Sequence, residues 1–129
     1  MVDPSKNPKK ADRPAPVILC VDDERPALSM RSAILTGAGY TVLSASNSHQ
    51  ALELFDKNHV DLVITDHLLV GATGIQLARR IQETRPDLPV IILSGILDKP
   101  DDADEGYFFL SKAAGPTEML SQVGRLLKL

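Results

Sequence analysis

The sequence has one cysteine, no tryptophan, few aromatic residues and no long apolar run. A single cysteine, Cys20, cannot form an internal disulfide, which favours a reducing compartment. No apolar stretch approaches the roughly 18 residues that a membrane span needs. The first 16 residues are too polar and too rich in proline for a signal peptide. We therefore expect a cytoplasmic protein that makes no membrane contact.

An excess of positive charge is also missing, since the formal net charge is -3. This balance argues against direct nucleic-acid binding through bulk positive charge. The length of 129 residues suits one domain. A hydrophobic content of 43% and a charged content of 24% are ordinary globular values, which exclude a disordered, collagen-like or coiled-coil chain.

The charge is unevenly distributed along the chain. Residues 1–14 carry four basic and two acidic side chains, and four of the nine prolines lie within the first 16 residues. This composition predicts a flexible, basic, proline-rich tail over 1–15 and a folded domain over 16–129. Residues 98–105 carry five acidic side chains against one lysine, and we interpret them as a solvated loop.

Short apolar runs alternate with amphipathic stretches from Val17 onward. Runs of this kind are typical of strands that are buried on both faces of a parallel sheet. The predicted strands are 17–21, 40–43, 62–65, 90–93 and 107–110. The alternation predicts an α/β fold with a doubly wound, five-stranded parallel sheet and helices on both faces.

The segments between the strands carry helical spacing. We expect Asn47 with Gln50, and Thr73 with Gln76, to form capping boxes at two helix starts. Only 12 residues separate Ser94 from Tyr107, so the fourth helix is predicted to be shortened. The other two helices are predicted from apolar stripes, one formed by Ala27, Met30, Ile34 and Ala38 and one by Met119, Leu120, Val123, Leu126 and Leu127.

Charged and hydroxyl side chains follow the predicted strands, at the carboxyl ends where ligands bind in parallel sheets. Asp22 and Asp23 follow the first strand, and Asp66 follows the third. Ser94 follows the fourth, and Lys112 lies just beyond the fifth. We therefore expect three carboxylates, one hydroxyl and one ammonium group to converge at one edge of the sheet.

This set of groups matches the charge demands of phosphoryl transfer. Nearby carboxylates repel one another unless a cation lies among them, and oxygen ligands suit Mg²⁺. Asp66 could then act as a carboxylate nucleophile. Lys112 could neutralise a phosphoryl oxygen, and the Ser94 hydroxyl could hydrogen-bond another.

Over residues 16–128 the chain resembles the receiver domain of two-component response regulators. The resemblance rests on five short matches that occur in order and at matching spacing. They are Val21-Asp22-Asp23-Glu24, Asp66 after Asp61-Leu62-Val63-Ile64-Thr65, Gly74 eight positions beyond Asp66, Leu93-Ser94-Gly95, and Phe109-Leu110-Ser111-Lys112.

The resemblance implies a flavodoxin-like topology and a role for each matched residue. Asp66 would accept a phosphoryl group from a histidine kinase or histidine phosphotransfer protein. Mg²⁺, or Mn²⁺, would be held by Asp22, Asp23, Asp66 and the backbone carbonyl of Leu68. Ser94 and Phe109 would occupy switch positions, and Lys112 would bind the phosphate.

The same resemblance implies a signalling module without separate substrate turnover. Its partners would be the phosphoryl donor and an unknown downstream effector protein, and the chain would be a monomer or a weak dimer. Because the sequence ends at Leu129, just after the last predicted helix, we expect a stand-alone receiver without an output domain.

Four departures from the family pattern concern the output surface. Leu69-Val70 replaces the usual Met-Pro, and Ala113 replaces the proline after the lysine. Phe109 lacks the hydroxyl of a tyrosine at the aromatic switch position, and the segment after Ser94 is short. These departures motivate an alternative hypothesis, a constitutive interaction module that binds partners regardless of phosphorylation.

Two further alternatives have less support. An aspartate-nucleophile phosphohydrolase would need a second acid two residues after Asp66, where Leu68 stands. A flavin-binding protein shares the topology, but three carboxylates form a poor phosphate cradle without a metal.

We expect packing or surface roles for the three histidines and for the cysteine. Strand alternation points His67 away from Asp66, so we expect it to pack or to lie at the surface. His49 and His59 are predicted surface residues, and Cys20 is predicted to be an inert core thiol.

Overall fold

The computed structural model describes residues 14–95 and 107–128. The predicted tail therefore lies almost wholly outside the described residues, and so do the predicted acidic loop and the shortened fourth helix. The elements in chain order are β1 (Val17–Val21), α2 (Arg25–Gly37), β2 (Thr41–Ala45), α3 (Ser48–Lys57), β3 (Leu62–Asp66), β4 (Leu68–Leu69), β5 (Ala72–Thr73), α4 (Gly74–Thr84), β6 (Val90–Ser94), β7 (Phe108–Ser111) and α5 (Pro116–Leu126).

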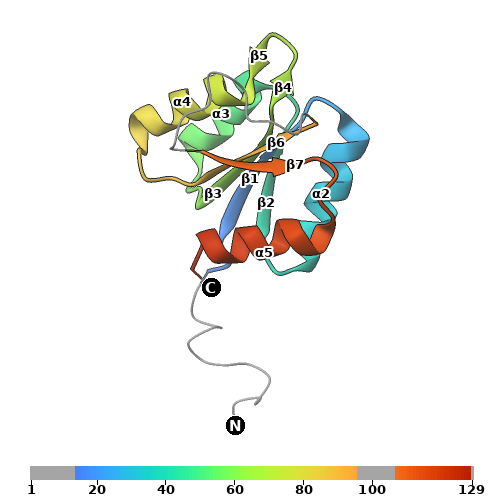
Figure 1. Cartoon of the computed structure of the whole chain (residues 1–129). Coiled ribbons are helices and arrows are strands. Elements are labelled where there is room, and N and C mark those ends of the chain that lie inside the picture. The colour runs from blue at the N-terminus through green and yellow to red at the C-terminus, as the bar shows by residue number, and fades with distance from the viewer. Residues whose placement is uncertain (1–13, 96–106, 129) are drawn as a thin grey trace.

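A five-stranded parallel sheet forms the centre of the fold, as predicted (Figure 1). The strand order is β2-β1-β3-β6-β7, so β3 is the middle strand. Its last residue, Asp66, is in register with Leu93 of β6, and Thr65 is in register with Val21 of β1. The carboxyl ends of β1, β3 and β6 consequently lie side by side at one edge.

Two hydrophobic clusters cover the two faces of this sheet. Alternate residues of β1 point to opposite faces, so Leu19 and Val21 join one cluster while Ile18 and Cys20 join the other. The first cluster packs under α3 and α4, and the second packs under α2 and α5, which places two helices on each side (Figure 1). This layering holds the strand ends, and the side chains that follow them, in fixed positions.

The expectation that all five strands are buried on both faces is wrong for the two edge strands. Every residue of β3 and β6 is buried, and so is β1 after its first residue. In β2 only Ala45 is buried, and in β7 no residue is fully buried. An edge strand has a neighbour on one side only, so the helices cover it incompletely.

The apolar stripe predicted for α2 is only partly right, since Ile34 packs against the core cluster but lies beside the buried face. The buried residues of this helix are Leu28 and Leu35, whereas Met30 is 66% exposed and Ala38 lies at the surface. The face that meets the sheet therefore runs through Leu28 and Leu35, and it includes Arg31 at the position between them. The stripe predicted for α5 includes both buried residues of that helix, Met119 and Val123.

One of the two predicted capping boxes is complete. At α4, the Gln76 N–H donates to the Thr73 hydroxyl and the Thr73 N–H donates to the Gln76 side chain. At α3, the Gln50 N–H donates to the Asn47 side chain, but the Gln50 side-chain oxygen, Oε1, accepts from the Ser46 N–H and not from that of Asn47. The α3 start is thus capped without the reciprocal bond that defines the box.

A short hairpin, β4 with β5, was absent from the prediction. It follows Asp66 directly and turns at Val70 and Gly71, where Gly71 has a φ of 77° that favours glycine. Two-residue strands carry too little pattern to be recognised in a sequence. The hairpin leaves Leu68 63% and Val70 81% exposed beside the sheet edge.

Among the helices of the described residues, none has the length and apolar character needed to cross a membrane.

Candidate metal and phosphoryl-acceptor site

Three aspartates come together at the carboxyl edge of the sheet. Asp22 and Asp23 follow β1, and Asp66 ends β3. One carboxylate oxygen of each lies within 4.8 Å of the others. Asp22 is fully buried, Asp66 is 4% exposed and Asp23 is half-buried. The strand order places these side chains together because β1 and β3 are neighbours in the sheet.

The donor set of this cluster fits a hard divalent cation. All three ligand atoms are carboxylate oxygens, which suit Mg²⁺ or Mn²⁺ better than a softer metal. Three carboxylates so close together repel one another, and a cation among them would offset that repulsion. The partial exposure of Asp23 leaves one side of the cluster open to water, which Mg²⁺ usually retains as additional ligands.

Backbone groups fix the orientation of two of these carboxylates. The Glu24 N–H donates to Asp22 Oδ1 at 2.9 Å. The Val70 N–H, at the tip of the unpredicted hairpin, donates to Asp23 Oδ2 at 2.9 Å. The hairpin therefore has a structural task at the site, because it ties the segment after β3 to the segment after β1.

Lys112 contacts the predicted acceptor directly. Its Nζ lies 2.9 Å from Asp66 Oδ2, and the two side chains are 38% and 6% exposed. The Lys112 backbone N–H donates to the Ser94 carbonyl oxygen at 2.9 Å, which joins the ends of β6 and β7. The ammonium group thus reaches Asp66 from the segment that follows β7, a strand two positions away from β3 in the sheet.

The remaining predicted site residues lie around this centre. Ser94 is the last residue of β6 and is 4% exposed. Phe109 is half-buried on β7 and packs against the cluster beneath α3 and α4. Leu68 begins β4, two residues after Asp66, which places its backbone next to the cluster along the chain.

Gly74 has a steric reason for being glycine. A Cβ atom at this position would lie 2.5 Å from the Asp66 carbonyl oxygen and 3.1 Å from the Thr65 side chain. The Gly74 N–H donates to the His67 carbonyl oxygen at 2.7 Å, so the start of α4 packs tightly on the end of β3. The spacing of eight residues between Asp66 and Gly74 reflects this close approach.

Arg31 is a charged residue at the site that sequence reasoning missed. Its Nη1 lies 3.1 Å from Asp22 Oδ2, and the two side chains are 13% and 0% exposed. The signal was available in the spacing, because Arg31 falls three residues after Leu28 and four before Leu35 on the buried face of α2. A cation on that face requires a buried anion near it.

None of the three histidines belongs to the carboxylate cluster. His67 is 8% exposed and its Nδ1 makes no hydrogen bond, so it is a packed residue. His59 Nε2 lies 2.7 Å from Asp61 Oδ1, and His49 Nε2 lies 2.8 Å from Glu53 Oε1, both at the surface. These positions agree with the packing and surface roles that the sequence predicts.

Cys20 is buried in β1, as predicted, and its ionisation is affected by its surroundings. Burial raises the pKa of the Cys20 thiol above its ordinary value of 9.0, and the nearby Arg31 guanidinium partly offsets this rise. The thiol therefore remains protonated at neutral pH.

The fold and the site together define an open α/β protein with an acidic, lysine-flanked site at the carboxyl edge of its sheet. The response regulator receiver domain family matches residues 18–123, which is most of the chain. The chain belongs to this family of two-component signalling domains.

Individual relatives support the same assignment. The phosphate regulon transcriptional regulatory protein PhoB of Pseudomonas aeruginosa is 33% identical over 118 residues, covering 86% of this chain and 51% of PhoB. The signal receiver domain of an HD domain-containing protein from Pseudomonas fluorescens is 32% identical, with a TM-score of 0.81 and coverage of 89% and 96%. The response regulator TrrA of Thermotoga maritima, solved in complex with Mg²⁺-BeF, is 27% identical, with a TM-score of 0.80 and coverage of 86% and 98%.

This chain spans about half the length, or less, of the curated relatives that it matches. The shared part is the receiver domain. Receiver domains are typically non-catalytic signalling modules that interact with histidine kinases and with effectors.

Proposed function

We propose that this chain accepts a phosphoryl group on Asp66 from a phosphohistidine, in a reaction that depends on Mg²⁺, and thereby switches a partner-binding surface. One observation carries the proposal. The Asp66 carboxylate lies within 4.8 Å of two further carboxylates on one side and 2.9 Å from the Lys112 ammonium group on the other.

In the transfer step, an Asp66 carboxylate oxygen attacks the phosphorus of the phosphohistidine. The O–P bond forms as the P–N bond breaks, and the electron pair of the broken bond remains on the imidazole nitrogen, which then takes up a proton. Lys112 neutralises part of the charge on the phosphoryl oxygens as a compact, mobile cation. Its 38% exposure allows it to turn from the carboxylate to the phosphoryl group.

Asp22, Asp23 and Asp66 are the residues that would hold the metal ion, with the backbone carbonyl of Leu68 as a fourth protein ligand. A bound Mg²⁺ supplies positive charge that offsets the carboxylates and the incoming phosphoryl group. The presence of Mg²⁺-BeF in the related TrrA structure supports this choice of ion.

Ser94, Lys112 and Phe109 are the proposed switch elements. The backbone bond from Lys112 to Ser94 couples the two residues, so a shift of Ser94 toward a phosphorylated Asp66 would carry the end of β7 with it. Phe109 lies two residues before Ser111 on the same strand. Phosphorylation would in this way bias a two-state surface around 94–112.

The partners of this surface follow from the family. We propose a histidine kinase or a histidine phosphotransfer protein as the donor, and an effector protein as the target. We further propose that residues 16–129 form the folded unit and that it works in the cytoplasm as a monomer or weak dimer. In this proposal it turns over no separate substrate.

The alternative of a constitutive interaction module is less well supported. The grouping of Asp22, Asp23 and Asp66 with Lys112 supports the switch, because a phosphorylation-independent scaffold does not need such a cluster. Equal partner binding by the wild type and by Asp66→Ala would reverse this preference.

Incubation with acetyl phosphate tests the proposal without a cognate kinase. We expect an acid-labile, hydroxylamine-sensitive phosphate that appears in the presence of Mg²⁺, disappears with a chelator, and is absent from Asp66→Asn. A label that persists in Asp66→Asn would overturn the assignment of Asp66, and an unlabelled wild type would overturn the proposed chemistry.

A further inference from the structure

The ion pair between Arg31 and Asp22 plays no part in the phosphoryl transfer described above. It lies at the same carboxylate cluster, yet it reaches the cluster from α2 and not from a strand end. The Arg31 side chain is 13% exposed and Asp22 is completely buried. A guanidinium group in this position neutralises one of the three carboxylates before any metal ion arrives.

We propose that Arg31 competes with the divalent cation for Asp22 and thereby lowers the metal affinity of this chain. The inference rests on the proposed metal site. Asp22 Oδ1 accepts from the Glu24 N–H and Oδ2 accepts from Arg31, so both oxygens of this carboxylate are engaged. A metal ion that binds here meets a carboxylate already paired and a buried positive charge beside it.

The competition has a clear electrostatic cause. Like charges a few ångströms apart repel strongly where water is excluded, and Asp22 lies in such a place. Either the guanidinium moves away when the metal ion binds, or it stays and opposes the ion. Both cases cost free energy that a neutral side chain at position 31 would not cost.

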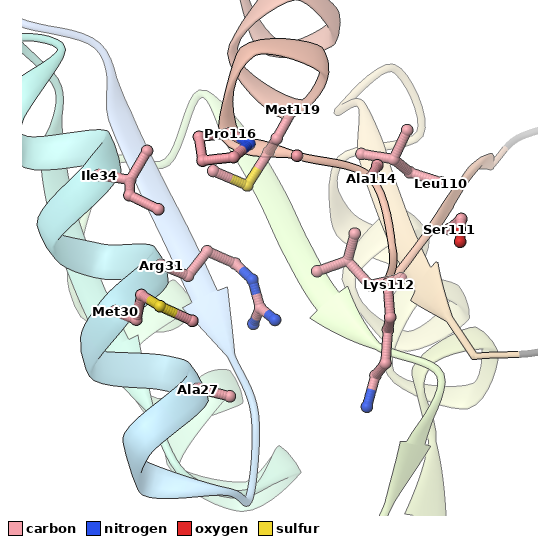
Figure 2. A pocket seen from close by; sticks show the side chains of 12 residues that line it. Ala27, Met30, Arg31, Ile34, Leu110, Ser111, Lys112, Ala114, Pro116 and Met119 are labelled. Carbon is pink, nitrogen blue, oxygen red and sulfur yellow. The ribbon is translucent and has the colours of Figure 1, made fainter.

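The structure provides space into which Arg31 can move. A cavity of about 210 Å³ lies between α2 and the segment that joins β7 to α5, and Arg31 forms part of its wall. Figure 2 shows the Arg31 side chain extending from α2 toward Lys112, with Met30, Ile34 and Met119 around it. The cavity therefore offers room for the guanidinium beside its present position.

A purely structural role for Arg31 makes a different prediction. If Arg31 only stabilised the fold by pairing with Asp22, its removal would lower stability and leave the intrinsic metal affinity unchanged. Metal binding measured directly on the folded protein distinguishes the two roles, and it does so without any phosphorylation step.

The experiment is a calorimetric titration with MgCl₂ of the wild type and of Arg31→Met, at one pH and one ionic strength. We expect Arg31→Met to bind Mg²⁺ about tenfold more tightly, within the 5- to 150-fold range typical of coupled binding events. Arg25→Met is the matched control, because it removes the same charge from an exposed position at the start of the same helix. We expect it to change the affinity by less than about twofold, since exposed charges are screened.

A second background locates the effect at Asp22. In Asp22→Asn, the carboxylate for which Arg31 competes is gone, so we expect Arg31→Met to have less than about a twofold effect there. If Arg31→Met fails to fold, as circular dichroism would show, Arg31→Gln replaces it and should also bind Mg²⁺ more tightly.

The outcomes separate this inference from the proposed function. Equal or weaker Mg²⁺ binding by the folded Arg31→Met would overturn the inference while the metal site itself stands. An absence of Mg²⁺ binding in both proteins would overturn the metal site and the inference with it. Mg²⁺ binding that is detected for Arg31→Met but not for the wild type would support both the metal site and the competition by Arg31.

Discussion

Two cations neutralise the same carboxylate cluster, and they differ in burial and in origin. Lys112 comes from the segment after β7, contacts Asp66 at 2.9 Å and is 38% exposed. Arg31 comes from α2, contacts Asp22 at 3.1 Å and is 13% exposed. An exposed, flexible ammonium group can follow a phosphoryl group onto Asp66, whereas a buried guanidinium group is suited to hold Asp22 while no metal ion is present.

The two cations thus pair with different members of the cluster, Arg31 with Asp22 and Lys112 with Asp66. The Lys112 contact belongs to the acceptor chemistry that we propose for Asp66. The Arg31 contact comes from α2 and does not enter the proposed transfer step. Substitutions that remove one cation at a time therefore distinguish the contribution of Lys112 from that of Arg31.

The largest expected effect is on the rate of phosphorylation. We expect Lys112→Met to slow labelling of Asp66 by acetyl phosphate about 10²- to 10³-fold, the usual cost of removing one electrostatic contact to a transition state. Lys57→Met, at an exposed position in the last turn of α3, is the control and should label at the wild-type rate. Quench-flow or mass-spectrometric time courses at saturating Mg²⁺ measure both, and equal rates for the two variants would remove Lys112 from the site chemistry.

The next effect concerns stability without metal. Arg31→Met leaves Asp22 buried and without its cation, so we expect the free energy of unfolding in a chelator to fall by about 3 kcal/mol. Lys112→Met should cost about 1 kcal/mol or less, because that pair is partly exposed. Urea titrations with and without Mg²⁺ measure the difference, and saturating Mg²⁺ should recover much of the loss in Arg31→Met. Equal losses in the two variants would contradict the distinction drawn between the two pairs.

A third change acts on the Asp66 side alone. Gly74→Ala places a methyl group 2.5 Å from the Asp66 carbonyl oxygen, so we expect a loss of about 1–3 kcal/mol in the free energy of unfolding. Gly124→Ala is the matched control, since nothing lies within 4 Å of the added atom and the position is inside α5. It should raise stability by about 0.5–1 kcal/mol through helix propensity. Thermal or urea unfolding that places both variants on the same side of the wild type would contradict the packing described for Gly74.

The smallest expected effect concerns the ionisation of the Cys20 thiol, which lies near Arg31. Burial raises the pKa of the Cys20 thiol, so the unfolded thiol ionises from about pH 9.0 while the folded thiol keeps its proton. The stability associated with this proton is present below pH 9.0 and is lost as the pH rises through the folded value. The slope is at most about 1.4 kcal/mol per pH unit.

The measurement compares the wild type with Cys20→Ala. Both proteins are unfolded in urea at several pH values from 8 to 10.5, a range set by the ordinary thiol pKa of 9.0. The gap in stability between them should narrow above pH 9.0, since only the wild type carries the thiol. A constant gap would mean that the thiol has no raised pKa in the folded protein.

Much of the site could be predicted because it depends on strand ends. Asp22, Asp66, Ser94 and Lys112 each follow an apolar run, and parallel strands bring their carboxyl ends to one edge. The parallel sheet and its five strands followed from the same runs. Burial of the edge strands was overestimated, because apolar composition alone does not say which strand lies at the border of the sheet.

Other features depend on contacts that a periodic pattern does not encode. The stripe predicted for α2 does not include Leu28 and Leu35, the residues that are buried. It therefore gives no sign of Arg31, which lies between them on the same face and contacts Asp22. The β4–β5 hairpin is too short to leave a period, although its Val70 N–H orients Asp23. Gly74 matches the family pattern, but only its close approach to the Asp66 carbonyl oxygen explains why glycine is needed there.

We propose that Asp66 accepts a phosphoryl group with the help of a cation held by the three aspartates. The most direct test is the extent of acid-labile labelling by acetyl phosphate as a function of Mg²⁺ concentration, in the wild type, Asp66→Asn and Arg31→Met. We expect saturable labelling of the wild type, no labelling of Asp66→Asn, and a half-maximal Mg²⁺ concentration that is lower for Arg31→Met. Labelling of the wild type that does not depend on Mg²⁺, or that survives in Asp66→Asn, would contradict this proposal.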